Sequence, residues 1–227
     1  MKKKIELSGR VLEYELERKK VKNINLRINP KGVFVSAGRA VPQSRIDAFL
    51  RDKAEFIFEA LDRFSSLPQF KPEDNVSISL LGKEYLLKIQ SAQRNSYKLD
   101  GSVIYLHLSH NAMASKVLDR LFRAMAEKVV PERCALLCRS MDRTLPQISY
   151  RAMKSRWGSC TPSKNSICIN SRLMAAPMEC VDYVIAHELC HFLQANHSAA
   201  FYSELEKIIP DWKLRKKQLS QFGKYLQ

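Results

Sequence analysis

The chain has 227 residues, 45% of them hydrophobic, and its 38 Lys and Arg against 23 Asp and Glu give a formal net charge of +15. The length allows one or two domains, and the composition is ordinary for a globular protein whose core is stable without disulfide bonds. No apolar run reaches the roughly 18 residues of a membrane span. Residues 1–7 lack the apolar segment of a signal peptide, so we expect a cytoplasmic protein outside the membrane.

The first hundred residues favour β-structure with one helix. Apolar and charged residues alternate over 12–16, which is typical of a half-buried strand. The turn residues 29–32 predict a hairpin, and from 42 to about 64 the apolar period becomes helical. We therefore predict a mainly antiparallel β region over 1–108 that acts as a scaffold or recognition region. Its further strands are predicted at 76–81, 83–90, 95–99 and 102–107.

The second half of the chain mixes helices with short strands. Helical periodicity returns at about 111–142, where Pro131 either kinks one helix or starts a second. Residues 148–150 and 165–170 predict two short strands. The loop at 156–160 lies between them, and Gly158 lets its backbone turn sharply.

The most informative stretch is 187–191, which reads His-Glu-Leu-Cys-His and is followed by a further histidine. This five-residue pattern arises by chance in on the order of 1% of chains of this length. Two histidines four residues apart lie on one face of a helix, so both can reach one metal ion. Apolar residues around them at helical spacing predict a largely buried helix that begins near Pro177. We predict one zinc ion per chain, bound by His187, His191 and His197.

The chemistry of this zinc site depends on the acidic residues around it. Three neutral imidazoles leave the fourth tetrahedral position open for water, as a catalytic zinc requires. Glu188 points to the side of the histidine pair, where its carboxylate can take a proton from that water without being a ligand. Glu204 is the alternative third ligand to His197, or it accepts a hydrogen bond from a histidine N–H. Asp182 is a second candidate for that supporting role.

Five runs in the region 150–215 form a recognisable set: Arg-Trp-Gly-Ser-Cys at 156–160, Asn-Ser-Arg-Leu at 170–173, Asp-Tyr-Val-Ile-Ala-His-Glu-Leu-Cys-His at 182–191, Asn-His-Ser-Ala-Ala-Phe at 196–201 and Pro-Asp-Trp at 210–212. Together they resemble the YgjP-like metallopeptidase family, which is similar to the SprT-like and WLM zinc peptidases. The N-terminal half matches only in general layout. The resemblance implies a zincin-type fold with a single zinc. It also gives the ligand roles to the same three histidines and the base role to Glu188.

We therefore predict an α+β protein whose second domain, 109–227, is a zincin-like metallopeptidase with an active-site helix. A zinc-activated water hydrolyses a peptide bond, with Glu188 as the general base. By resemblance, 165–170 is the candidate edge strand for an extended substrate, and an interior strand is the alternative. The candidates for contact with the substrate or the developing oxyanion are Arg156, Tyr202, Gly158, Ser159 and Cys160.

The densest basic stretch, 139–172, borders the proposed site. Its acidic residue is Asp142, and its basic residues are Arg139, Arg143, Arg151, Lys154, Arg156, Lys164 and Arg172. Such a field attracts polyanions, so nucleic acid is a candidate partner beside a peptide or protein substrate, and a solvated surface is the alternative. Two rival functions also remain open. They are a zinc hydrolase of non-peptide amides and a nucleic-acid-binding protein with a structural zinc.

Overall fold

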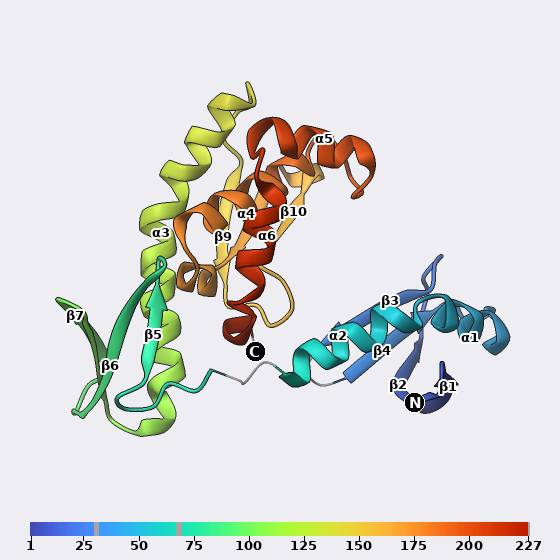
Figure 1. Ribbon diagram of the computed structural model, residues 1–227, viewed down its shortest axis with the longest axis horizontal. Helices are drawn as coiled ribbons and strands as arrows, with labels where there is room; N and C mark the ends of the chain where they lie inside the picture. The colour runs from blue at the N-terminus through green and yellow to red at the C-terminus, as the bar shows by residue number, and fades with distance from the viewer. Residues whose placement is uncertain (30–31, 67–69, 227) are drawn as a thin grey trace. The chain divides into compact units, whose positions relative to one another are not determined.

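The computed structural model describes residues 1–226 except 30–31 and 67–69, and the chain divides into two compact units, Met1–Pro68 and Gln69–Gln227 (Figure 1). The chain contains both helices and strands, so the predicted α+β class is confirmed. The division lies earlier than the domain boundary predicted after residue 108, because the strands of 77–108 pack into the core of the second unit. No helix in the described ranges is long and apolar enough to cross a membrane.

The first unit is a four-stranded sheet with two helices. It contains β1 (Lys2–Leu7), β2 (Arg10–Arg18), β3 (Asn25–Asn29), β4 (Gly32–Ala37), α1 (Gln43–Asp52) and α2 (Ala54–Ser66). The strand order is β1-β2-β4-β3, with a parallel pair between β2 and β4 and antiparallel pairs on both sides of it. The predicted alternation is confirmed, because Leu12, Tyr14 and Leu16 are buried in one core. The two central residues of the turn predicted at 29–32 lie outside the described residues, but Ile28 pairs with Val33 as in a hairpin.

The single helix predicted at 42–64 is wrong, because the structure has two helices there. Lys53 ends α1 with φ −102° and ψ 9°, outside the helical region. The apolar spacing nevertheless continues across the break, and Ile46, Leu50 and Ile57 are fully buried in the same core. Both helices therefore present one continuous apolar stripe, which is the part that the sequence pattern detects.

The second unit opens with a sheet that repeats this strand arrangement. It contains β5 (Ser77–Leu80), β6 (Lys83–Ser91), β7 (Ser96–Asp100) and β8 (Val103–Leu108), followed by the long helix α3 (Ala114–Ser140). The order is β5-β6-β8-β7, again two antiparallel hairpins joined by one parallel pair. The first hairpin of each sheet turns in the same way. Ser8 and Gly9 have φ of 49° and 77°, and Leu81 and Gly82 have φ of 51° and 76°. Helix α3 continues through Pro131, so no second helix starts there.

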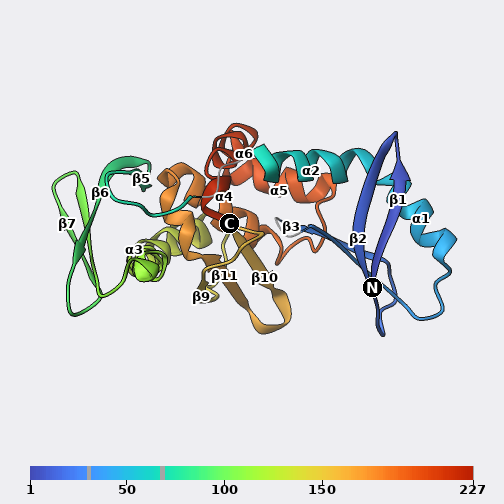
Figure 2. The ribbon, with the colours of Figure 1, turned by 90° about the horizontal axis from the view of Figure 1, so that it is seen from below.

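The remaining elements build the region around the predicted site. They are β9 (Gln147–Arg151), β10 (Gly158–Thr161), β11 (Ser166–Asn170), α4 (Met178–Cys190), α5 (Ala199–Ile208) and α6 (Trp212–Ser220). The sheet order is β10-β11-β9, so β11 is paired on both sides and the predicted edge strand at 165–170 is wrong. The interior alternative is correct, and β10 is an edge of this sheet. Helices α4 and α6 lie side by side in Figures 1 and 2 and contact each other.

Candidate metal centre

Helix α4 carries the first part of the site on its C-terminal turns. Pro177 stands immediately before the first turn, a position where its missing N–H costs nothing. Most residues of the helix are buried, including the apolar Val181, Ile185 and Leu189. His187 and Glu188 therefore belong to a rigid, buried element. The helix ends at Cys190, and His191 follows as its cap residue with φ −66° and ψ −15°.

The structure brings the three predicted histidines together. The potential ligand nitrogens of His187, His191 and His197 all lie within 4.8 Å of one another. His197 Nε2 lies 3.0 Å from His187 Nε2, so both rings direct that nitrogen to the same place. The Ser198 hydroxyl accepts a hydrogen bond from the Phe201 N–H and caps α5 there. The buried Phe201 ring supports all three imidazoles, with centroid distances of 4.8–4.9 Å.

The electrostatics favour the neutral form of His187 and His197, which metal binding requires. Burial, followed by the charges of His197, His191 and Lys216, lowers the pKa of His187 to about 3. The pKa of His197 is also lowered, first by burial and then by His191 and Lys216. His191 Nδ1 lies 3.2 Å from the Gln194 carbonyl, which can only accept, so Nδ1 carries the proton and Nε2 is free. Three imidazole nitrogens at this spacing fit one metal ion of the zinc class.

Glu188 lies beside the histidines and is almost fully enclosed. Its residue is only 6% exposed, and this burial raises its pKa to about 7, while the charge of Arg156 opposes the rise. The side chain lies directly against the backbone of β10. A Cβ atom added at Gly158 would lie 2.5 Å from Glu188 Oε1 and 2.7 Å from its Cγ. Glycine at 158 therefore provides the space that the Glu188 side chain occupies.

The loop before β10 is held by the buried side chain of Asn170. Its amide donates to the carbonyls of Met153 at 2.7 Å and Arg156 at 2.9 Å, and its backbone N–H donates to the Trp157 carbonyl at 2.8 Å. Its side-chain oxygen also accepts from the Arg172 N–H at 3.1 Å. Asn170 thereby fixes the segment that carries Arg156 and leads into Gly158. Sequence analysis missed this role, because the partners are backbone atoms far along the chain.

The other predicted contact residues are an aromatic ring beside His197 and two residues of the β10 edge. The Tyr202 ring stacks 6.3 Å from His197 and 4.6 Å from Trp212. Ser159 and Cys160 belong to β10, where they pair with Cys168 and Ile167. Burial, together with the charge of Glu188, raises the pKa of Cys160 to about 11, so this thiol stays protonated.

The acidic residues predicted to support the histidines have other partners. Asp182 is held by the Arg133 guanidinium through two hydrogen bonds of 2.7 and 2.6 Å, which join α3 to α4. Glu204 accepts a hydrogen bond of 2.7 Å from Lys207. The group of possible metal ligands in the described chain consists of the three histidines and does not include Glu204.

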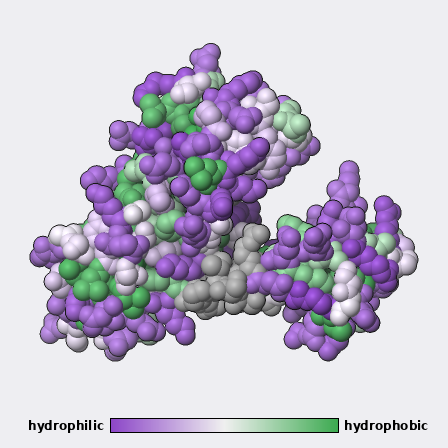
Figure 3. Space-filling model, viewed as in Figure 1, coloured by the Kyte–Doolittle hydropathy of each residue, from purple (hydrophilic) through white to green (hydrophobic). Residues whose placement is uncertain are grey.

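Two of the seven basic residues in 139–172 are used inside the fold. The Arg143 guanidinium lies 3.5 Å from the centre of the Phe192 ring and donates to Asn165 Oδ1 at 2.6 Å. Arg172 pairs with Asp119 at 2.7 Å. The other five are exposed: Arg139, Arg151, Lys154, Arg156 and Lys164. Hydrophilic residues cover most of the surface that Figure 3 shows.

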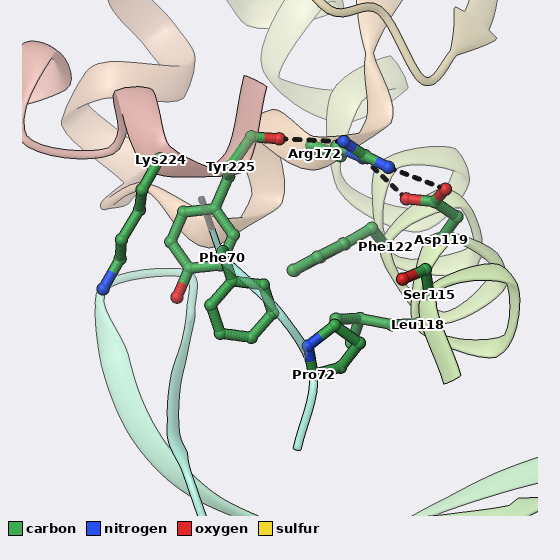
Figure 4. Close-up of a pocket in the computed structure, with 9 residues that line it drawn as sticks. All are labelled: Phe70, Pro72, Ser115, Leu118, Asp119, Phe122, Arg172, Lys224 and Tyr225. Carbon is green, nitrogen blue, oxygen red and sulfur yellow. Dashed lines mark hydrogen bonds and ion pairs between the residues drawn. The ribbon is translucent and has the colours of Figure 1, made fainter. Parts of the chain in front are cut away.

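Arg172 also lines a pocket formed where the C-terminus packs on α3 (Figure 4). Its guanidinium reaches Asp119 and the Tyr225 carbonyl, and the Phe70 ring lies 4.8 Å from the Tyr225 ring. Arg172 and Asp119, which both line the pocket, are thus already paired with each other. We assign it a structural role in anchoring the C-terminus.

The comparisons with known proteins agree with this geometry. The model of the family described as YgjP-like, metallopeptidase domain, matches residues 22–222. No curated protein and no solved structure matches the chain. The matched span covers most of the chain and includes the three clustered histidines, Glu188 and the β10 edge. The chain therefore belongs to the YgjP-like metallopeptidase family.

Proposed function

We propose that the protein is a zinc peptidase in which His187, His191 and His197 hold the metal. The observation that carries this proposal is the cluster of three imidazoles beside a buried carboxylate, within a family of metallopeptidases. Zinc held by three protein ligands supplies a Lewis acid that lowers the pKa of water and polarises a carbonyl. A structural zinc is usually closed by four protein ligands, so this donor set favours the catalytic reading over the structural one.

Glu188 is the proposed general base. Its pKa of about 7 suits both proton acceptance and proton donation near neutral pH. It takes the proton of the attacking water and then gives it to the leaving nitrogen of the peptide. Gly158 keeps the carboxylate in place, because β10 passes directly against it. Arg156 and Tyr202, together with the backbone of the β10 edge, are the proposed contacts for the substrate and the developing oxyanion.

The test combines metal content with proteolysis. Purified protein should carry about one zinc per chain, and His187→Ala with His191→Ala should abolish binding. Glu188→Gln should keep the zinc and lose peptidase activity by at least about a hundredfold, because an amide cannot accept the proton. Full zinc occupancy in the double histidine variant would contradict the site as drawn.

The two rival functions are separated by the substrate. A hydrolase of non-peptide amides would act on small amide libraries and leave peptides intact. A nucleic-acid-binding protein with a structural zinc would bind DNA tightly after Glu188→Gln and would show no turnover with any substrate.

We also propose that substrates are associated with nucleic acid. The supporting observation is the set of five exposed basic residues in 139–172, a stretch that includes β9, β10 and β11. Binding through phosphates should tolerate any sequence and weaken steeply with salt. Arg139→Glu with Lys164→Glu should lower DNA affinity and leave cleavage of a short neutral peptide unchanged. Arg143 is unsuitable for this test because it packs on Phe192. If the wild-type protein shows no salt-sensitive DNA binding, these basic residues form only a solvated surface and the proposal is wrong.

A further inference from the structure

The first unit concentrates its positive charge in one stretch of the chain. Residues 18–46 contain eight Lys and Arg and no Asp or Glu. The rest of Met1–Pro68 contains seven basic and nine acidic residues, so the net positive charge of this unit comes from that one stretch. A surface of this kind attracts polyanions, because no acidic residue within the stretch offsets its field.

The strand topology brings the two ends of this stretch together. β2 and β4 are parallel neighbours, so the segments that follow them leave the sheet at the same end. The Arg18 guanidinium donates to the carbonyls of Gly38 and Val41. A Cβ atom added at Gly38 would lie 3.0 Å from the Val21 carbonyl oxygen. The segment after β2 therefore contacts the segment after β4, and their basic residues lie at one end of the sheet, beside the start of α1.

Most of the charge at this end is not neutralised inside the fold. The nearest acidic residues in sequence are Glu17 and Asp47, one on each side of the stretch. Glu17 pairs with Lys19 at 2.6 Å, and Asp47 accepts a hydrogen bond of 2.6 Å from Gln43. Four other basic side chains are exposed and form no ion pair with any residue that the structure describes: Lys20, Lys22, Arg39 and Arg45.

Two of these four cations line an apolar hollow. Its lining consists of Lys22, Asn23, Ile24, Val41, Arg45 and Phe49. Arg45 and Phe49 are four residues apart on α1, so they lie on the same face of that helix. The three apolar side chains are only half-buried, so part of each meets solvent. The hollow thus offers an aromatic ring and aliphatic side chains together with two positive charges.

We propose that this end of the first unit binds single-stranded nucleic acid, with phosphates at Lys22 and Arg45 and a base against Phe49. A single strand presents negative phosphates and unpaired flat bases, the combination that a cationic groove with an aromatic ring recognises. A duplex keeps its bases stacked inside and would use only the charges. An acidic peptide matches the charges but brings no flat ring for the hollow. The inference concerns a different unit from the metal centre, so it does not depend on the proposed peptidase function.

The first experiment measures the charge contacts. Fluorescence anisotropy follows binding of the full chain to a labelled oligothymidine of about twelve nucleotides over a range of salt concentrations. Lys22→Glu with Arg45→Glu should lower the affinity at low salt by at least about tenfold. It should also reduce the slope of log affinity against log salt by about 1.4, since each phosphate contact with a single strand contributes about 0.7.

The matched control is Lys2→Glu with Arg51→Glu. These residues are exposed in the same unit but lie outside the stretch 18–46, and the change in net charge is identical. This variant should change the affinity and the salt slope little, because it removes no phosphate contact.

The second experiment measures the base contact. Phe49→Leu removes the ring and keeps an apolar side chain against the core. It should lower the affinity for the single strand by about five- to hundredfold, the range expected for one stacked base, and leave the salt slope unchanged. A duplex with the same number of phosphates should bind more weakly than the single strand and should respond little to Phe49→Leu.

Three results would overturn the inference. The first is an equal loss of affinity in the two charge-reversal variants, which would mean that only net charge matters. The second is equal binding of duplex and single strand with no effect of Phe49→Leu, which would leave a phosphate-binding surface without a base site. The third is binding of Lys22 and Arg45 to phosphatidylglycerol vesicles without any binding of the oligonucleotide, which would assign this end to a membrane surface. Loss of oligonucleotide binding in Arg139→Glu with Lys164→Glu tests the 139–172 surface separately.

Discussion

At the scale of single residues, the most demanding contact in the site is between Gly158 and Glu188. Gly158→Ala would bring a Cβ atom to 2.5 Å from Glu188 Oε1, so the carboxylate must move. Because a shift of about 1 Å in a catalytic group costs roughly a hundredfold in rate, we expect kcat/KM to fall by that order. Zinc content should be unchanged, since no histidine is touched. Metal analysis and peptide kinetics together test this expectation.

Ser159→Ala is the matched control, because Ser159 is the next residue of β10 and its change removes a hydroxyl without adding volume. It should retain most of the activity, because the proposed substrate contact of β10 is its backbone, which this change keeps. A Gly158→Ala variant that is as active as Ser159→Ala would show that the carboxylate has room to adapt.

The identity of the third ligand is a second prediction at this scale. His197→Ala should weaken zinc binding strongly, because its Nε2 lies 3.0 Å from that of His187. Glu204→Ala should weaken it little, because its hydrogen bond goes to Lys207. Titration of each variant with a zinc chelator measures the difference. The reverse order of affinities would mean that Glu204 is the ligand.

Residue-level prediction from the sequence succeeded where the chemistry is local. His187 and His191 are four apart on one helix, so spacing alone brings them together. Glu188 contacts Gly158 on a different element, and the charge of Lys216 also acts from a different element. The periodicity of the sequence does not reveal such interactions. Asp182 was predicted beside the histidines, but its partner Arg133 lies on a different helix.

At the scale of elements, the Arg133–Asp182 pair joins α3 to the helix that carries the metal site. Asp182 is only 7% exposed, and the guanidinium is more accessible. Removing one partner of a buried pair costs about 3–5 kcal/mol, and partial exposure brings our expectation for Asp182→Ala to about 2–3 kcal/mol. Urea unfolding monitored by circular dichroism measures this loss.

Lys207→Ala serves as the control for that experiment. It removes the exposed partner of Glu204 and should cost less than about 1 kcal/mol. Equal losses in the two variants would mean that the α3–α4 pair is no stronger than a surface pair.

The elements that the sequence misjudged share one physical cause. The stripe through Ile46, Leu50 and Ile57 predicts a buried helical face, but it does not reveal the break at Lys53. The run 165–170 predicts a strand, but whether that strand is an edge depends on partners elsewhere in the chain. Local sequence patterns therefore show whether an element is a helix or a strand better than they show which elements it contacts.

At the scale of the whole molecule, each compact unit has its own hydrophobic core. We predict that residues 70–227 alone bind zinc and cleave short peptides, because every residue of the proposed centre lies within them. Residues 1–66 alone should unfold cooperatively, since twelve of the residues described there form a buried hydrophobic core. Thermal unfolding of both fragments, with zinc analysis of the larger, tests this. Loss of zinc binding by the larger fragment would show that the centre needs the first unit.

The repeated strand order has a consequence for how the chain is made. In both four-stranded sheets each hairpin joins two strands that are adjacent in sequence, and one parallel strand pair joins the two hairpins. Each sheet therefore needs only one pairing between strands that are not adjacent in sequence before the helix that follows it. Local contacts form fast and domains fold as units during synthesis, N-terminal first. The first unit can thus complete its core while the ribosome is still making the second. The residues of the proposed metal centre leave the ribosome after both four-stranded sheets have emerged.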